Sequence, residues 1–160
     1  MTRPLGFTLI ELMITLAVLV ILATIAVPGF QNLVENNRTT TQTNELVTAL
    51  NSARSEAIKQ GVEVSVTASG NFASGWCVHA GDNCSGDNII RQYGQATSMS
   101  ITSSPETDRI TFDDRGAKSE PAGAFTLTVA PEDCPAGASE RARQIQIVNT
   151  GRVSVSRADC

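Results

Sequence analysis

The most distinctive pattern in the chain is a long apolar run near its start. Residues 12–30 are nineteen consecutive positions without a charged side chain. About 20 apolar residues are enough for a helix to cross the hydrocarbon core of a bilayer. Arg3 precedes the run, so we expect the amino end to stay cytoplasmic and the rest of the chain to lie beyond the membrane. A secretory signal fits less well, because its apolar part is only about 7–15 residues long and ends at a small-residue cleavage site.

The helical pattern continues past the apolar run. From residue 7 to residue 60 the helix-breaking residues are Pro28 and Gly29, and Gly61 then supplies a C-cap. Pro28 removes one backbone hydrogen bond, so the helix should bend or locally melt there. Residues 31–45 are polar on nearly every side. After them, a face expected to pack on an apolar surface is formed by Leu46, Leu50, Ala53 and Ala57, with Val47, Arg54 and Ile58 beside it.

After Gly61 the hydrophobic pattern changes to a period of two. Val62, Val64 and Val66 alternate with polar residues, which is typical of a half-buried strand. Further strands are predicted at residues 76–79, 89–92, 98–102, 109–112, 125–129, 144–148 and 152–156. The last two flank a hairpin turn signal at residues 149–151. The sequence therefore predicts an α+β fold, in which a long N-terminal helix packs on an antiparallel β-sheet.

Two features at the start of the apolar run indicate processing and assembly. A short polar leader meets the run at Gly6 and Phe7, and Glu11 brings a carboxylate into the segment. An ionisable group at membrane depth costs about 2.5–3.5 kcal/mol on insertion scales, so it needs a partner. We predict that the partner is the amine of a neighbouring subunit's Phe7, freed by cutting between Gly6 and Phe7. This pairing would set the axial offset between subunits.

The segment GFTLIELMITLAVLVILATIAVPGF closely resembles the class III signal of type IV pilins and type II secretion pseudopilins. The resemblance implies that a prepilin peptidase cuts after Gly6 and methylates Phe7. It also implies that Glu11 is the assembly carboxylate and that Pro28 is the family's helix-weakening proline. The chain would then comprise a leader at 1–6, a transmembrane or filament-core helix at 7–30 and a head at 31–160. The head would contain helix 31–60 and a β-sheet at 62–160.

A looser resemblance covers most of the head. The RSEA segment at residues 54–57, the strand around Trp76 and the hairpin at Gly151 and Arg152 are similar to the GspH/FimT group of minor pilins and pseudopilins. This resemblance implies a minor pilin that helps initiate a type IV pilus and links tip minor pilins to the major pilin. A GspH-like pseudopilin of type II secretion is the first alternative. Pro28 and the cysteines favour the FimT/FimU-like pilus branch of this group over the secretion branch.

The same resemblance implies partners and a location. The partners would be other minor pilins, the major pilin, the prepilin peptidase and the inner-membrane assembly platform. The subunit would be stored in the inner membrane with its head in the periplasm, and it would later join the filament at the cell surface.

Four cysteines lie beyond the apolar run, at Cys77, Cys84, Cys134 and Cys160. They indicate an oxidising compartment and disulfide bonds. Three pairings are available, of which proximity favours Cys77–Cys84 and so leaves Cys134–Cys160. A zinc site is the rival interpretation, but no spacing is CxxC and His79 is the single histidine, so we expect no metal. An oxygen-rich loop at residues 81–88 lacks the EF-hand spacing and is expected to be solvated.

Composition narrows the remaining function classes. The 160 residues include 12 basic and 16 acidic side chains, for a net charge of −4, and aromatics make up 4%. The net negative charge argues against a nucleic-acid-binding protein that relies on overall positive charge. The low aromatic content argues against one that binds single strands by stacking on their bases. We find no nucleophile–base set, catalytic carboxylate pair or phosphate loop, and we predict neither enzymatic activity nor a cofactor.

A local group of arginines makes DNA an alternative binding partner. Its members are Arg141, Arg143, Arg152 and Arg157, which could contact phosphates without sequence preference. Some FimT-like DNA receptors carry a Gly-Arg-X-Arg element near the C-terminus. Here Gly151 and Arg152 match its first half, but Ser154 replaces the second arginine. A DNA-receptor minor pilin for natural transformation is therefore the second alternative.

Overall fold

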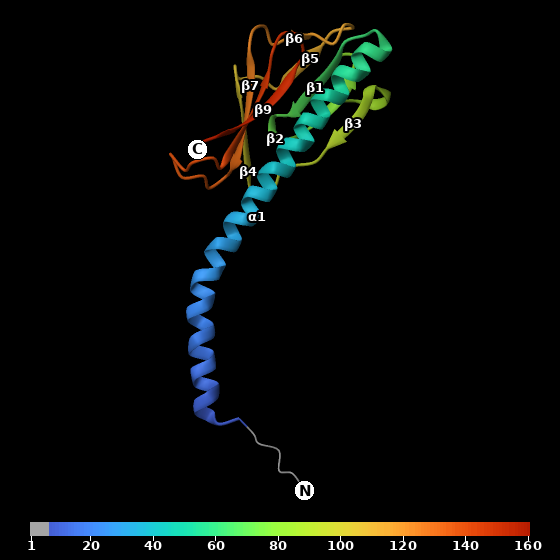
Figure 1. Cartoon of the computed structure of the whole chain (residues 1–160). Helices are drawn as coiled ribbons and strands as arrows, with labels where there is room; N and C mark the ends of the chain where they lie inside the picture. The colour runs from blue at the N-terminus through green and yellow to red at the C-terminus, as the bar shows by residue number, and fades with distance from the viewer. Residues whose placement is uncertain (1–6) are drawn as a thin grey trace. The chain divides into compact units, whose positions relative to one another are not determined.

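The computed structural model describes residues 7–160, so the expected leader at 1–6, with Gly6, lies outside the described residues. The described residues form helix α1 (Leu9–Gln60), a short 3-10 helix η1 (Gly86–Asn88) and nine strands (Figure 1). They divide into two compact units, with the boundary between Asn37 and Arg38. We describe each unit by itself.

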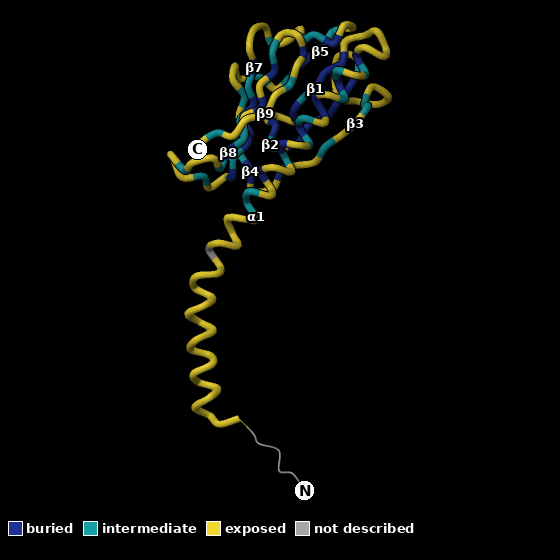
Figure 2. The backbone as a smooth tube through the Cα atoms, viewed as in Figure 1, coloured by how far each residue is buried: buried dark blue, intermediate teal, exposed yellow. Residues whose placement is uncertain are grey.

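The first unit, up to Asn37, contains the apolar part of α1 and the start of its polar stretch. A capping box starts this helix, because the Thr8 Oγ1 accepts a hydrogen bond from the Glu11 N–H at 3.3 Å while the Glu11 carboxylate accepts one from the Thr8 N–H at 2.9 Å. The helical backbone is continuous across position 28, so the local melting that the proline permits is not seen. Figure 2 shows the apolar part of this helix as exposed.

The second unit, Arg38–Cys160, is called the head below. It combines the end of α1 with two antiparallel sheets. The five-stranded sheet has the order β3-β2-β1-β5-β6, and the four-stranded sheet has the order β4-β7-β8-β9. The strands are β1 (Val64–Ser69), β2 (Asn71–Ala80), β3 (Ile89–Tyr93), β4 (Met99–Ser104), β5 (Arg109–Phe112), β6 (Lys118–Glu120), β7 (Phe125–Pro131), β8 (Ala142–Ile147) and β9 (Val153–Ala158).

The core of the head forms between α1 and one face of the strands. The predicted helix residues Leu46, Leu50, Ala53 and Ala57 are fully buried in the cluster that also contains Trp76, Phe112, Phe125, Leu127 and Ile145. Burying one such large apolar side chain contributes about 1.5–3 kcal/mol. The predicted α+β fold, with a long helix packed on antiparallel strands, is confirmed. Val47 lies at the margin of this core and Ile58 is exposed.

Some strand boundaries differ from the prediction, and each difference has a local cause. The helix ends at Gly61, whose positive φ of 66° and N–H bond to the Ala57 carbonyl form a C-cap, and the next strand begins only at Val64. Val62 is therefore exposed rather than in a strand. The predicted strand began only at residue 76 because Gly75 interrupts the hydrophobic pattern, whereas β2 begins at Asn71. Position 75 requires glycine, since a Cβ there would lie 2.8 Å from the Tyr93 carbonyl oxygen of β3. The three-residue β6 has too few apolar positions to show a period.

Candidate functional site

The apolar part of α1 is the first candidate site, because its side chains have no interior to occupy. Phe7 is 92% exposed, and the large apolar side chains along residues 9–33 are exposed as well. By length and composition, α1 is the one helix among the described residues that could cross a membrane. An apolar surface of this extent needs lipid or other helices to cover it.

Glu11 lies at the start of this surface and is held in place by Thr8. One carboxylate oxygen of Glu11, Oε2, accepts hydrogen bonds from both the N–H and the Oγ1 of Thr8, each at 2.9 Å. The carboxylate is thus fixed in the first helical turn, close in sequence to Phe7. Thr8 is not among the residues predicted from the sequence, although a threonine three residues before a glutamate and an apolar run is the sequence signature of a capping box.

In the head, Arg54 joins three segments that are distant in sequence. Its Nε donates to the Gly116 carbonyl at 2.8 Å, and its Nη2 donates to the Thr150 carbonyl at 3.2 Å. Gly151 has a φ of +75°, and a Cβ there would collide with the Gly116 carbonyl oxygen. The helix, the β5–β6 turn and the β8–β9 turn therefore meet at one point. The two segments behind the looser family resemblance, 54–57 and 151–152, prove to be neighbours.

The structure contains two disulfides, Cys77–Cys84 and Cys134–Cys160, the pairs that proximity along the chain favours. The second ties the C-terminus to the loop after β7, where Cys160 also exchanges backbone hydrogen bonds with Gly137 and Ala138. The sulfur atoms of Cys77 and Cys84 lie within 4.8 Å of a nitrogen of His79. Because both thiols are consumed by the disulfide, this group is not a metal site in the structure.

His79 belongs to a polar layer on the face of the five-stranded sheet that is turned away from the core. It is fully buried, and its Nε2 lies 2.9 Å from the Thr67 Oγ1. In the same layer Ser65 and Thr111 share a hydrogen bond of 2.9 Å, and Arg109 donates to the Asp82 carbonyl at 2.6 Å. Burial lowers the pKa of His79 below its ordinary value, so this histidine is neutral at neutral pH.

The structure does not bring the four C-terminal arginines together, because Arg141, Arg143 and Arg157 lie at the open end of the β8–β9 hairpin and Arg152 lies at its turn. Arg143 and Arg157 are opposite each other on β8 and β9. Arg143 donates to the carbonyls of Glu140 and Ala142 at 2.8 and 2.9 Å, and Arg157 pairs with the Glu140 carboxylate at 2.7 Å. Arg141 also has a partner, while Arg152 is exposed at the hairpin. The acidic neighbours keep the arginines from forming a purely basic face.

Comparison with known proteins places these features in context. Residues 42–151 match the family described as Type II transport protein GspH, and residues 1–27 match the prokaryotic N-terminal methylation motif. Two proteins of Pseudomonas aeruginosa named fimbrial protein are each 46% identical to this chain over 59 residues. That alignment covers 37% of this chain and 38% of each relative, so the chain spans little more than a third of the curated relatives it matches.

Solved structures with a similar fold include the type IV minor pilin FimU of Pseudomonas aeruginosa strain PAO1 in two crystal forms. The TM-scores are 0.65 and 0.61, at 21% and 20% sequence identity. The alignments cover 76% and 73% of this chain, and 90% and 91% of those chains. At this level of identity the similarity establishes the fold.

Proposed function

The chain belongs to the GspH family of pilin-like proteins, and from this premise we propose that it is a minor pilin of a type IV pilus. It helps initiate pilus assembly and links tip minor pilins to the major pilin. The observation that carries this proposal is the exposed apolar helix with Glu11 at its start, in a chain whose head has a complete core of its own. Family and fold are those of structural proteins rather than enzymes.

In the proposed mechanism, proteolytic processing creates the positively charged amine with which Glu11 pairs. A prepilin peptidase cuts between Gly6 and Phe7 and methylates the new amine. In the filament, the apolar helices bundle along residues 7–30, and the Glu11 carboxylate pairs with the Phe7 amine of a neighbouring subunit. Pro28 weakens the helix where it leaves the bundle. The charge pair sets the axial offset, and close packing between apolar helices replaces their contacts with lipid.

The proposed location and partners follow from this mechanism. Before assembly the helix spans the inner membrane and the head lies in the periplasm, where both disulfides persist. After assembly the chain is part of the pilus at the cell surface. Its partners are other minor pilins, the major pilin, the prepilin peptidase and the inner-membrane assembly platform.

Two other functions have an observation in their favour. The family description names type II transport, which favours a secretion pseudopilin; this function requires that exoproteins accumulate in the periplasm of cells lacking the gene. Exposed Arg152 favours a DNA receptor, which requires salt-sensitive DNA binding that is lost in Arg152→Ala. The ion pair between Arg157 and Glu140 weighs against the DNA receptor, because it neutralises part of the basic group.

The test of the proposal is a count of surface pili by electron microscopy. It uses cells that lack this gene and in which pilus retraction is also disabled, so that assembly alone is measured. We expect few or no pili, and recovery when the wild-type gene is restored. A normal number of pili in the deletion strain would overturn the proposal and favour secretion or DNA uptake.

A further inference from the structure

The four-stranded sheet has a free edge at β4. This strand pairs with β7 on one side, and it is the end of its sheet among the described residues. The Glu132 N–H donates to the Ser98 carbonyl, and Ser100 and Thr102 stand in the same register as Ser98. In an antiparallel pair the intervening residues direct their backbone groups the other way. Met99, Ile101 and Ser103 therefore offer backbone donors and acceptors at the free edge.

An open groove runs along this free edge. Its volume is about 870 Å³, and it lies between β4, the β1–β2 turn at Gly70, the start of β2 at Asn71 and Ala73, and the loop before β5. Phe72, Met99 and Ile101 line it, and their side chains are largely buried, with exposed fractions of 2–5%. These three residues belong to the hydrophobic core and form the floor of the groove. The unpaired edge of β4 beside this floor is a template for another strand.

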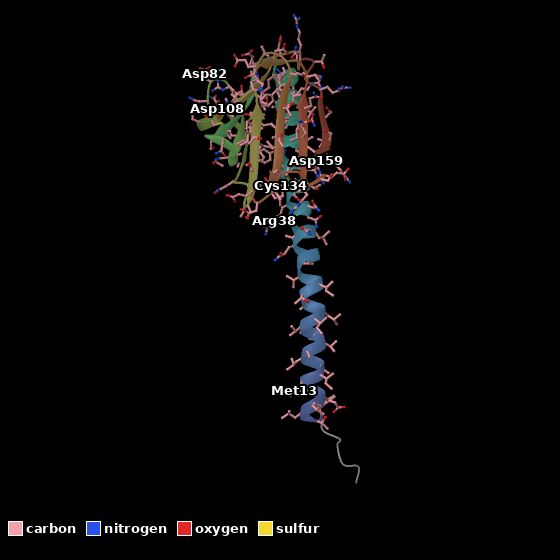
Figure 3. All side chains as sticks on the ribbon, turned by 90° about the vertical axis from the view of Figure 1, so that its left-hand side faces the viewer. Met13, Arg38, Asp82, Asp108, Cys134 and Asp159 are labelled. Atoms are coloured by element: carbon pink, nitrogen blue, oxygen red, sulfur yellow. A yellow bond between two sulfur atoms is a disulfide. The ribbon has the colours of Figure 1, made fainter. Side chains whose placement is uncertain are left out.

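The charged residues that line the groove are all acidic. Three carboxylates line it, those of Glu106, Asp108 and Glu132, and all three residues are exposed. None of its other lining residues is Lys, Arg or His. The chain's C-terminal arginines lie elsewhere, on β8, β9 and their flanks; in Figure 3, Asp108 and Asp159 lie toward opposite edges of the head. A binding partner for this groove therefore carries positive charge.

We propose that the β4 groove is the docking site for an extended strand of a neighbouring pilin-like subunit. The incoming strand adds to β4 through main-chain hydrogen bonds, as in other cases of β-augmentation. It runs over the floor formed by Phe72, Met99 and Ile101 and places lysine or arginine side chains beside the three exposed carboxylates. This inference rests on the proposed function, since a filament subunit is surrounded by other pilin heads.

The chemistry of the groove favours this occupant over other ligands. A row of unpaired backbone groups matches a second row on an extended chain, whereas a compact small molecule reaches only part of it. A nucleic acid is disfavoured, because three carboxylates repel its phosphates. The occupant is therefore a basic, extended protein segment.

Site-specific photo-crosslinking in the full-length chain tests the inference. The photoreactive residue benzoylphenylalanine replaces exposed Thr102 on β4 in cells that make the pilus, and crosslinked peptides are identified by mass spectrometry after irradiation. We expect a crosslink to an extended segment of another pilin-family subunit, with lysine or arginine in the crosslinked peptide. The matched control places benzoylphenylalanine at exposed Ser154 on β9, the opposite edge of the same sheet, and should not give this product.

Charge reversal tests the proposed role of the carboxylates. The double variant Glu106→Lys with Glu132→Lys should lower the crosslink yield by about five-fold, since like charges oppose docking. The control Glu63→Lys changes an exposed carboxylate outside the groove and should leave the yield unchanged. A yield unaffected by the double variant, no crosslink at all, or crosslinks only to a second copy or to a protein that is not a pilin would overturn the inference.

The crosslinking experiment and the count of surface pili can fail independently of each other. If pili are lost in the deletion strain but no pilin crosslink forms at Thr102, the docking site is wrong and the minor-pilin function stands. If the crosslink forms but the deletion strain makes normal pili, the docking site stands and the role in initiation is wrong.

Discussion

At the scale of single residues, Arg54 holds together parts of the head that are 62 and 96 residues away in the sequence. Its guanidinium donates to two backbone carbonyls, one in the β5–β6 turn and one in the β8–β9 turn. Hydrogen bonds to a charged group contribute about 1.5–3 kcal/mol each. The Lys118 N–H also donates to the Asn149 carbonyl at 2.9 Å, so the bonds of Arg54 reinforce one backbone hydrogen bond between these two regions.

We predict that Arg54→Ala lowers the free energy of unfolding of the head by about 2–3 kcal/mol. Arg54→Lys should recover little of the loss, because an ammonium group cannot reproduce the two-pronged geometry. The measurement is urea unfolding of Arg38–Cys160, which contains every residue of the hydrophobic core. Arg115→Ala is the control, since Arg115 is exposed in the adjoining turn, and should change stability by less than about 0.5 kcal/mol. Equal effects of the two alanine variants would contradict the assignment.

His79 makes the stability of the head depend on pH. Its pKa is lowered mainly by burial, and the charge of Arg109 adds to this, whereas the backbone of Ala80 and the charge of Asp82 act in the opposite direction. The unfolded chain takes up this proton near pH 6.5 and the folded head only at lower pH. The stabilisation is therefore present above about pH 6.5 and is lost as the pH falls below it.

We predict that the free energy of unfolding falls between about pH 7.5 and about pH 5.5 in the wild-type head. In His79→Gln the side chain does not titrate, so the fall over this interval should be smaller. Urea titrations of both proteins at both pH values make the comparison. The same pH dependence in both proteins would show that other groups are responsible.

The sequence predicts that some of these residues are important, but it does not predict their contacts. The family pattern marks Arg54, yet its two carbonyl partners lie on turns whose meeting depends on the packing of both sheets. For His79 the sequence excludes zinc and catalysis and leaves a surface or core histidine. It does not predict the polar layer, because a single histidine on a strand gives no signal of one behind a disulfide loop. Thr8 could have been found, since its spacing to Glu11 is a local signature.

At the scale of elements, strands with regular alternation were predictable. β7 shows strict alternation of buried and half-buried positions, and the sequence predicts it within two residues. β6 escaped because it has only three residues, one of which, Lys118, is a buried cation that donates to the Pro121 carbonyl. The division into two sheets was also beyond the sequence, because it depends on which strand edges pair across long loops.

The two disulfides should differ in their contribution to stability. They close loops with sequence separations of 26 and 7 residues, and the chain-entropy relation gives about 3.5 and about 2.4 kcal/mol for these loops. We predict that Cys134→Ala with Cys160→Ala destabilises the head by more than Cys77→Ala with Cys84→Ala. Urea unfolding of the two double variants measures the difference. The reverse order would mean that packing beneath the Cys77–Cys84 loop outweighs chain entropy.

Two substitutions at the start of α1 distinguish the helix-capping role of Glu11 from its proposed role in charge pairing. Glutamine at position 11 can still complete a capping box with Thr8 but carries no charge. We predict that Glu11→Gln inserts into the membrane and accumulates normally but does not enter filaments, whereas Thr8→Ala, which keeps the carboxylate, still assembles. Membrane fractionation measures insertion, and immunoblotting of sheared pili measures assembly. Normal assembly of Glu11→Gln would refute the proposed charge pair.

At the scale of the whole molecule, the chain divides its tasks between two units. The residues of the first unit expose an apolar helix surface that requires neighbours, while the head buries its own core and is held by two disulfides. Such a surface requires lipid or other helices to cover it. In the proposed assembly, the β4 groove of the head contacts another subunit.

The central claim is that this chain is a low-abundance subunit of the pilus itself. Its most direct test is quantitative mass spectrometry of pili sheared from wild-type cells and purified free of membrane. The account predicts that peptides of this chain are present in far smaller amount than the major pilin, and that the N-terminal peptide begins at a methylated Phe7. Pili from which the chain is absent, or a chain that keeps residues 1–6 in the filament, would contradict the account.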